Sequence, residues 1–106
     1  MKFPVHTHCD YTVIALSGEI DIKYSPTARE QILEHLENGE NLLIDMTQVE
    51  YIDSSGVANL VEGLRIARHK DLKFALISVS EPAMQVLRLA RLDKVLPIHD
   101  SASDSL

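Results

Sequence analysis

Alternating apolar and polar residues at the start of the chain predict two β-strands. In residues 3–9, apolar and β-branched side chains fall on one face and His6 and His8 on the other, which is the two-residue period of a strand. Residues 11–16 are rich in β-branched and aromatic types, which favour strands. With Asp10 near the turn, the two segments predict a β-hairpin.

A helical pattern follows the hairpin. Ser25 and Pro26 predict a helix start, with a hydroxyl cap followed by a proline at the first helical position. Asn38 and Gly39 close the pattern, because glycine adopts the left-handed conformation of a helix C-cap without strain. The spacing of three and four places four apolar residues on the inner face of this helix, namely Ala28, Ile32, Leu33 and Leu36.

Short uninterrupted apolar runs predict two buried strands, at residues 41–46 and 73–79. Such runs are typical of strands that are covered on both faces of a sheet. Residues 47–50 are expected to form a loop after the first of these strands. Residues 95–99 predict a short edge strand, because their proline cannot donate a hydrogen bond to a sheet ladder.

Helical spacing returns after Gly56 and again after Ser80. The first of these helices is expected to turn inward Val57, Leu60, Val61, Leu64 and Ala67 or Arg68. The second runs to about Leu89, and its expected inward residues are Ala83, Val86, Leu87 and Ala90. Alternating strands and helices from residue 41 onward imply parallel pairing. The pattern therefore predicts an α/β fold, in which a mixed sheet of the N-terminal hairpin and parallel central strands packs against helices.

Composition narrows the class of protein. A chain of 106 residues with 45% hydrophobic residues is expected to form one domain with a modest core and a frayed tail at residues 101–106. A net charge of −6 argues against binding nucleic acid, which requires a basic face. No apolar run approaches the roughly 18 residues of a membrane span. The N-terminus lacks the core of a secretory signal and Cys9 is the only cysteine, so a cytoplasmic location is expected.

The residue types offer little for catalysis or metal binding. The sequence DSSG at residues 53–56 lacks the first glycine of a nucleophile elbow, and there is no glycine-rich phosphate loop. His6 and His8 share a strand face, but Cys9 points the other way and a structural zinc site requires four ligands. We therefore expect a protein that is not an enzyme, with no metal site and with histidines that face solvent.

The DSSG motif (residues 53–56) has two interpretations. Asp, Ser and Gly are preferred at helix N-termini, where a side-chain oxygen accepts a hydrogen bond from an unpaired backbone N–H. Alternatively, a hydroxyl at that position is a phosphate acceptor, because helix N-termini favour negative charge. An added charge of about −1.5 to −2 would then disrupt a partner docked on that surface. The residues alone leave both interpretations open, and Asp21 is either a loop carboxylate or a functional one.

Several segments together resemble the STAS family, and within it the bacterial anti-sigma factor antagonists. The stretch LSGEID at residues 16–21 is similar to the signature that ends a strand in this family. The stretch LLIDMTQVEYIDSSGV at residues 42–57 is similar to its most specific motif. The later strand and helix have similar spacing, so the resemblance covers nearly the whole chain and implies a single STAS domain over residues 1–106.

This resemblance implies a function in partner switching. In such proteins the serine directly after the aspartate of the motif is phosphorylated, and here that serine is Ser54. The unphosphorylated protein binds a serine-kinase anti-sigma factor with a histidine-kinase-like ATPase fold, which releases a sigma factor. Phosphorylation ends the binding and a PP2C-type phosphatase restores it. ATP belongs to the kinase, so the resemblance implies no cofactor for this chain. The implied partner-binding residues are Asp21, Asp53, Ser54, Ser55 and Gly56.

Two further points qualify the resemblance. A STAS subunit of a lipid-transport ABC complex, which is not phosphorylated, is the alternative, because such relatives also carry a D-S-x-G stretch. Many antagonists continue the motif with leucine and glycine, whereas residues 57–59 here are Val-Ala-Asn. Alanine is the better helix former, so the helix after the motif is expected to be firm.

Overall fold

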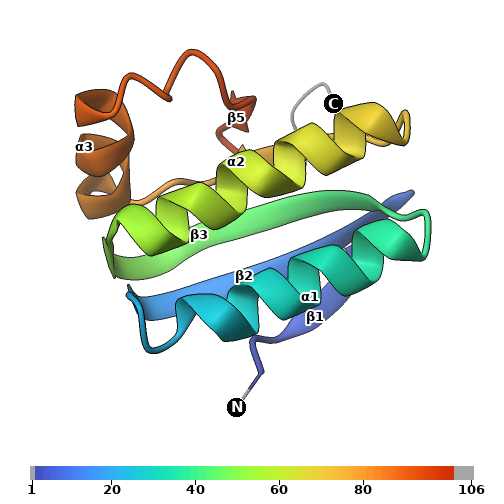
Figure 1. Ribbon diagram of the computed structural model, residues 1–106, viewed down its shortest axis with the longest axis horizontal. Helices are drawn as coiled ribbons and strands as arrows, with labels where there is room; N and C mark the ends of the chain where they lie inside the picture. Colours follow the sequence, from blue (N-terminus) through green and yellow to red (C-terminus); the bar gives the residue numbers. More distant parts are fainter. Residues whose placement is uncertain (1, 102–106) are drawn as a thin grey trace.

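Each predicted strand and helix is present in the computed structural model, which describes residues 2–101 (Figure 1). The elements are β1 Val5–His8, β2 Tyr11–Ile20, α1 Ser25–Glu37, β3 Asn41–Ile52, α2 Ser54–His69, β4 Phe74–Ile77, α3 Glu81–Leu89 and β5 Ile98–His99. The prediction of a frayed tail at residues 101–106 falls, apart from Ser101, on residues outside the described range. Among the described residues, no helix is both long and apolar enough to cross a membrane.

The described strands form one mixed sheet in the order β1-β2-β3-β4-β5. β1 and β2 form the predicted antiparallel hairpin, which turns at Cys9 and Asp10. The pairings of β2 with β3, β3 with β4, and β4 with β5 are all parallel. The predicted α/β fold, with an N-terminal hairpin joined to parallel central strands, is confirmed.

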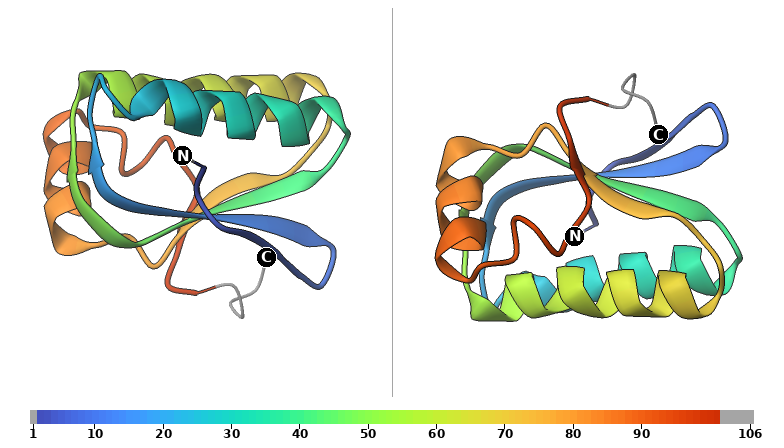
Figure 2. Two further views of the ribbon diagram at one scale, coloured as in Figure 1. Left: turned by 90° about the horizontal axis from the view of Figure 1, so that it is seen from below. Right: turned by 90° about the horizontal axis from the view of Figure 1, so that it is seen from above.

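The helices are distributed unequally around the sheet. α1 and α2 lie side by side on one face, whereas α3 lies apart from them at one end of the sheet (Figure 2). The main core between sheet and helices includes Ile14, Ile44 and Leu60, each at most 1% exposed. A smaller cluster consists of Val13, Leu43, Ala75 and Ile77. Leu42 and Ile44 of β3 belong to the main core and Leu43 between them to the smaller cluster, so this part of the strand is buried on both faces as predicted.

The loop predicted at residues 47–50 is wrong, because β3 continues through them to Ile52. The pairing with β2 skips one residue of β3 between the pairs Ala15–Asp45 and Ser17–Gln48, and it shifts again two residues later. Such bulges disturb the two-residue alternation, so the segment resembles a loop in sequence. Val49 is nevertheless only 2% exposed and belongs to the core.

The predicted hydroxyl cap of α1 is also wrong. The helix begins at Ser25, one residue earlier than expected, and Tyr24 occupies the N-cap position without a side-chain hydrogen bond. Ser25 is buried, and its N–H donates to the backbone carbonyl of Asp21 at 2.7 Å. Its carbonyl accepts a 2.7 Å hydrogen bond from Asn59 Nδ2. The start of α1 is therefore held by the preceding loop and by α2.

The inner faces of the helices match the predicted pattern with a few differences. Among the predicted inward residues, Leu33, Val61 and Val86 are only half-buried and Ala90 is exposed. Two buried polar residues, Gln31 and Asn59, were not predicted. Each of their side chains binds backbone of another segment, so their burial leaves no polar atom without a partner.

Gly63 allows α1, α2 and β4 to approach closely. A Cβ atom at this position would lie 2.8 Å from Cε2 of Phe74 and 3.0 Å from Cγ2 of Ile32. Both neighbours are buried, at 4% and 1% exposed, so neither side chain has free space to move into.

We expect Gly63→Ala to lower the free energy of unfolding by about 1–2 kcal/mol in urea denaturation. Alanine gains up to about 1 kcal/mol in helix propensity, but overpacking costs about 1–3 kcal/mol. In a Phe74→Leu background, where the ring is absent, the same substitution should be neutral or stabilising. An equal loss in both backgrounds would contradict the steric explanation.

Candidate functional site

The sheet brings two distant acidic segments together. β2 and β3 are parallel neighbours, and Ile20 pairs with Ile52 at their carboxyl ends. The N–H of Asp53 donates to the carbonyl of Ile20 at 3.2 Å, which extends the pairing by one step. The loop that contains Asp21 therefore lies directly beside the DSSG motif.

Asp53 is the N-cap of α2. Its backbone is extended, with φ −102° and ψ −173°, and its Oδ1 accepts hydrogen bonds from the N–H groups of Ser55 at 2.9 Å and Gly56 at 3.1 Å. Its carbonyl accepts the bond from Val57 N that starts the helical ladder. The helix-cap interpretation of the motif is thus confirmed.

The surroundings of Asp53 stabilise its charged form. The hydroxyl of Ser55 is the main cause of a lowered pKa, and the N–H groups of Gly56, Ser55 and Ile22 lower the pKa further. Desolvation opposes them without reversing the direction. Because the Ile22 N–H belongs to the loop after β2, this loop also helps to keep Asp53 charged.

The two serines of the motif have different environments. Ser55 is half-buried, and its Oγ donates to Asp53 Oδ1 at 2.5 Å. Ser54 is the first residue of α2 and is exposed. Its hydroxyl makes no hydrogen bond to any other described residue. Ser54 thus presents a free hydroxyl, whereas that of Ser55 is part of the cap.

Asp21 organises the loop between β2 and α1. Its Oδ1 accepts hydrogen bonds from the N–H groups of Lys23 at 3.0 Å and Tyr24 at 3.3 Å. Its carbonyl accepts from the N–H groups of Tyr24 and Ser25. The side chain of Asp21 thus acts as a loop carboxylate, and its part in partner binding stays a prediction.

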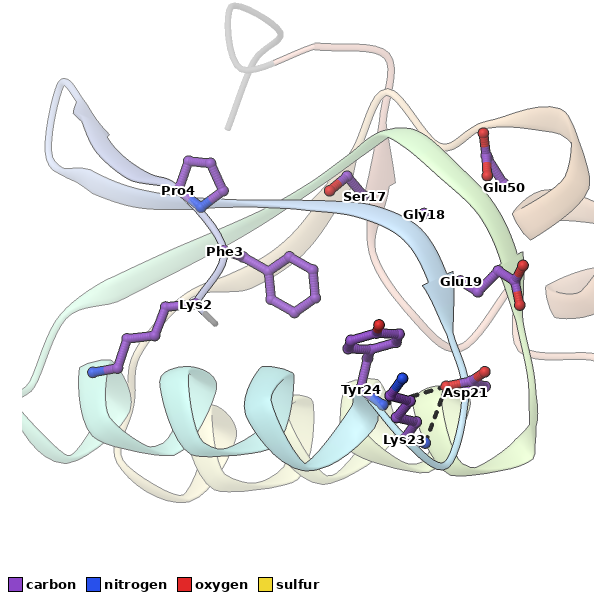
Figure 3. Close-up of a pocket in the computed structure, with 10 residues that line it drawn as sticks. All are labelled: Lys2, Phe3, Pro4, Ser17, Gly18, Glu19, Asp21, Lys23, Tyr24 and Glu50. Atoms are coloured by element: carbon purple, nitrogen blue, oxygen red, sulfur yellow. Dashed lines mark hydrogen bonds between the residues drawn. The ribbon is translucent and has the colours of Figure 1, made fainter.

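A cavity of about 750 Å³ opens next to this loop (Figure 3). It is lined by Lys2, Phe3, Pro4, Ser17, Gly18, Glu19, Asp21, Lys23, Tyr24 and Glu50. Phe3 and Tyr24 point into it from opposite walls (Figure 3). The backbone of Phe3 is fixed by Gln31, which donates to its carbonyl at 2.9 Å and accepts from its N–H at 2.8 Å. The sequence carries no local signal for this cavity, because its walls are distant in the chain.

The close approach of α2 to β2 depends on Gly56. A Cβ atom here would lie 2.7 Å from Cγ1 of Ile52 and 2.8 Å from the backbone oxygen of Ile20. Because the second contact is with the backbone, no side-chain rotation relieves it. Gly56 thus fixes the distance between the motif and the Asp21 loop.

The histidines do not form a metal centre with other residues of the described chain. Within residues 2–101, no group of three or more His, Cys, Asp or Glu side chains is arranged to hold a metal ion. His6 is exposed on β1, and Cys9 lies at the turn with φ 55°.

Comparison with known proteins identifies the family. The model of the STAS domain matches residues 2–105, and the chain belongs to this family. An anti-sigma F factor antagonist of Paenibacillus polymyxa is 24% identical over 108 residues, covering 100% of this chain and 92% of that protein.

Solved structures agree with this assignment. A Thermotoga maritima protein assigned as an anti-sigma factor antagonist is 27% identical, with a TM-score of 0.88 over 96% of this chain and 89% of that one. The antagonist SpoIIAA in its unphosphorylated form has a TM-score of 0.74 at 19% identity, over 96% of this chain and 90% of that one, and shares the fold.

We expect Gly56→Ala to reduce the free energy of unfolding by about 2–3 kcal/mol, because the new methyl group overpacks a backbone contact. The amide signals of residues 20–24 should shift in NMR spectra, since α2 must move away from β2. An unchanged urea midpoint with unchanged amide signals would show that this contact is loose.

The pKa of Asp53, followed by carbon-13 NMR of its carboxyl group, should lie below the ordinary value of about 3.9. A lowered folded-state pKa stabilises the native state fully above the unfolded pKa and loses this effect as the pH falls through the folded pKa. Ser55→Ala should raise the pKa of Asp53, because it removes the main cause of the shift. Asp53→Asn should make the free energy of unfolding fall less steeply as the pH is lowered into the acid range. An unchanged fall would contradict the role of Asp53 in acid stability.

Proposed function

We propose that this chain is an anti-sigma factor antagonist that acts by partner switching in the cytoplasm. Its unphosphorylated form binds a serine-kinase anti-sigma factor and so releases a sigma factor. Phosphorylation of Ser54 ends the binding, and a PP2C-type phosphatase restores it. The chain itself is not an enzyme, because the kinase and the phosphatase supply the catalytic groups.

The observation that carries this proposal is the difference between the two serines. A phosphate acceptor must bring its hydroxyl oxygen to the γ-phosphorus of ATP in the kinase. Ser54 is exposed and its hydroxyl has no partner among the described residues, whereas the hydroxyl of Ser55 is bound to Asp53. During transfer, the Ser54 oxygen bonds to phosphorus as the bond to ADP breaks, and a base of the kinase takes the proton.

Electrostatics support a switch in binding. Asp53 already accepts hydrogen bonds from the N–H groups of Ser55 and Gly56, so a phosphate on Ser54 would place a second anion beside this carboxylate. The lowered pKa of Asp53 keeps this carboxylate charged at neutral pH. Two neighbouring anions repel each other, and they repel the phosphates of the nucleotide that the docked kinase holds at Ser54.

Packing explains why the fold would tolerate the phosphate. Ser54 is exposed, and the core of the domain lies beneath α2 rather than at its first residue. The modification therefore changes the charge of the surface without burying an ion.

Known relatives are consistent with this function. The Paenibacillus polymyxa protein is named for its action against the anti-sigma F factor, and SpoIIAA is described in its unphosphorylated form. Antagonism of an anti-sigma factor is thus attributed by name to a protein that aligns with this chain over its full length.

Incubation with the cognate anti-sigma kinase and ATP should add one phosphate, at Ser54. Ser54→Ala should abolish phosphorylation and keep binding, and Ser54→Asp should weaken binding at least about tenfold, which corresponds to 1.4 kcal/mol. Mass spectrometry locates the phosphate and calorimetry measures the affinity. Ser55→Ala is the matched control, and it should still be phosphorylated.

Two results would contradict the proposal. A phosphate found only on Ser55 would overturn the choice of acceptor. Ser54→Asp binding as tightly as the unmodified chain would overturn charge as the cause of release.

A further inference from the structure

Ile22 is an apolar side chain exposed beside the proposed phosphorylation site. It lies in the loop between β2 and α1, and 79% of its surface is exposed. Among the large hydrophobic residues of the described chain, only Leu89 is more exposed, at 86%. Leaving such a side chain in water costs free energy that burial against a partner would recover.

The loop that carries Ile22 is held in place by its neighbours. Asp21 accepts hydrogen bonds from the N–H groups of Lys23 and Tyr24 through its side chain and from those of Tyr24 and Ser25 through its carbonyl. Isoleucine is β-branched, so its side chain has few rotamers to lose on binding. An apolar group that is fixed before binding gives affinity at a low cost in entropy.

Carboxylates outnumber cations around this apolar group. Asp21 precedes it and Lys23 follows it in the chain, Asp53 caps the neighbouring helix α2, and Glu19 lies at the exposed end of β2. Glu19 is paired in register with Tyr51, which is 49% exposed. An apolar centre with a charged rim is the usual composition of a protein–protein interface.

We propose that Ile22 is the apolar anchor of the surface that docks the anti-sigma factor, and that it inserts into an apolar pocket rimmed by Arg or Lys. This inference rests on the proposed function, because the partner is the kinase that reaches Ser54. The position of Ile22 next to Ser54 indicates that the partner is the kinase, and the acidic rim indicates that the kinase surface is basic. The apolar pocket of the kinase accepts Ile22, and cations around that pocket pair with the acidic rim of this chain.

Leu89 provides a contrast on the same molecule. It lies at the end of α3, between the cationic residues Arg88 and Arg91 in sequence. A basic partner surface that complements the rim around Ile22 would be repelled there. Leu89 is thus a matched control, equally large and apolar but in a region of opposite charge.

The test compares Ile22→Ala and Leu89→Ala in binding to the anti-sigma kinase by calorimetry at several salt concentrations. Ile22→Ala should weaken binding about 30-fold, as expected for an interface hot spot, and Leu89→Ala less than about twofold. Both variants should unfold at the same temperature as the unaltered chain. Ile22→Ala removes no charge, so the dependence of affinity on salt should stay the same, whereas Glu19→Gln should reduce it.

Phosphorylation kinetics give a second measurement. Ile22→Ala should raise the KM of the kinase for this chain and leave kcat unchanged at saturation, because Ile22 docks the chain and does not touch the transferred phosphate.

The outcomes separate the two proposals. Unaltered affinity of Ile22→Ala for a kinase that binds and phosphorylates the unaltered chain would overturn the anchor alone. A larger loss with Leu89→Ala than with Ile22→Ala would place the docking surface at α3 and would also overturn it. Failure of the unaltered chain to bind or be phosphorylated would overturn the proposed function, and the anchor with it.

Discussion

The parallel pairing of β2 with β3 is the constraint on which the site depends. Parallel neighbours end at the same edge of a sheet, so the segments that follow Ile20 and Ile52 emerge side by side. The bond from Asp53 N–H to the Ile20 carbonyl fixes their relative position, and Gly56 allows α2 to pack directly on that carbonyl. Both α1 and α2 begin at this edge, so the exposed residues of two loops form one surface.

A single carboxylate joins the structural features of this surface. Asp53 caps α2 and holds the hydroxyl of Ser55, and these contacts and the Ile22 N–H favour its charged form. The stability of the helix start therefore does not require the hydroxyl of Ser54. Ser55 supports the helix cap and Ser54 is the exposed serine. A modification of Ser54 therefore leaves the cap in place.

Irregular pairing shapes the same end of the sheet. β3 contributes an extra residue at two places in its pairing with β2, and Asp45 supports the first by accepting from the N–H and the hydroxyl of Thr47. Bulges increase the local bend of a strand. The paired strands curve at this end, and the cavity beside Asp21 opens under the bend (Figures 2 and 3).

Local patterns in the sequence determined the order of strands and helices, and they determined the cap at residues 53–56, because its hydrogen bonds join residues at most three apart. The choice of Ser54 over Ser55 as the predicted phosphate acceptor came from the resemblance to the family. Only the tertiary structure decided the features that join distant segments. The strand through residues 47–50 exists because β2 pairs with it, and Ser25 is not a cap because Asp21 and Asn59 bind its backbone. The adjacency of Ile22 and Asp53, 31 positions apart in the sequence, likewise requires the paired ends of two strands, which no local period encodes.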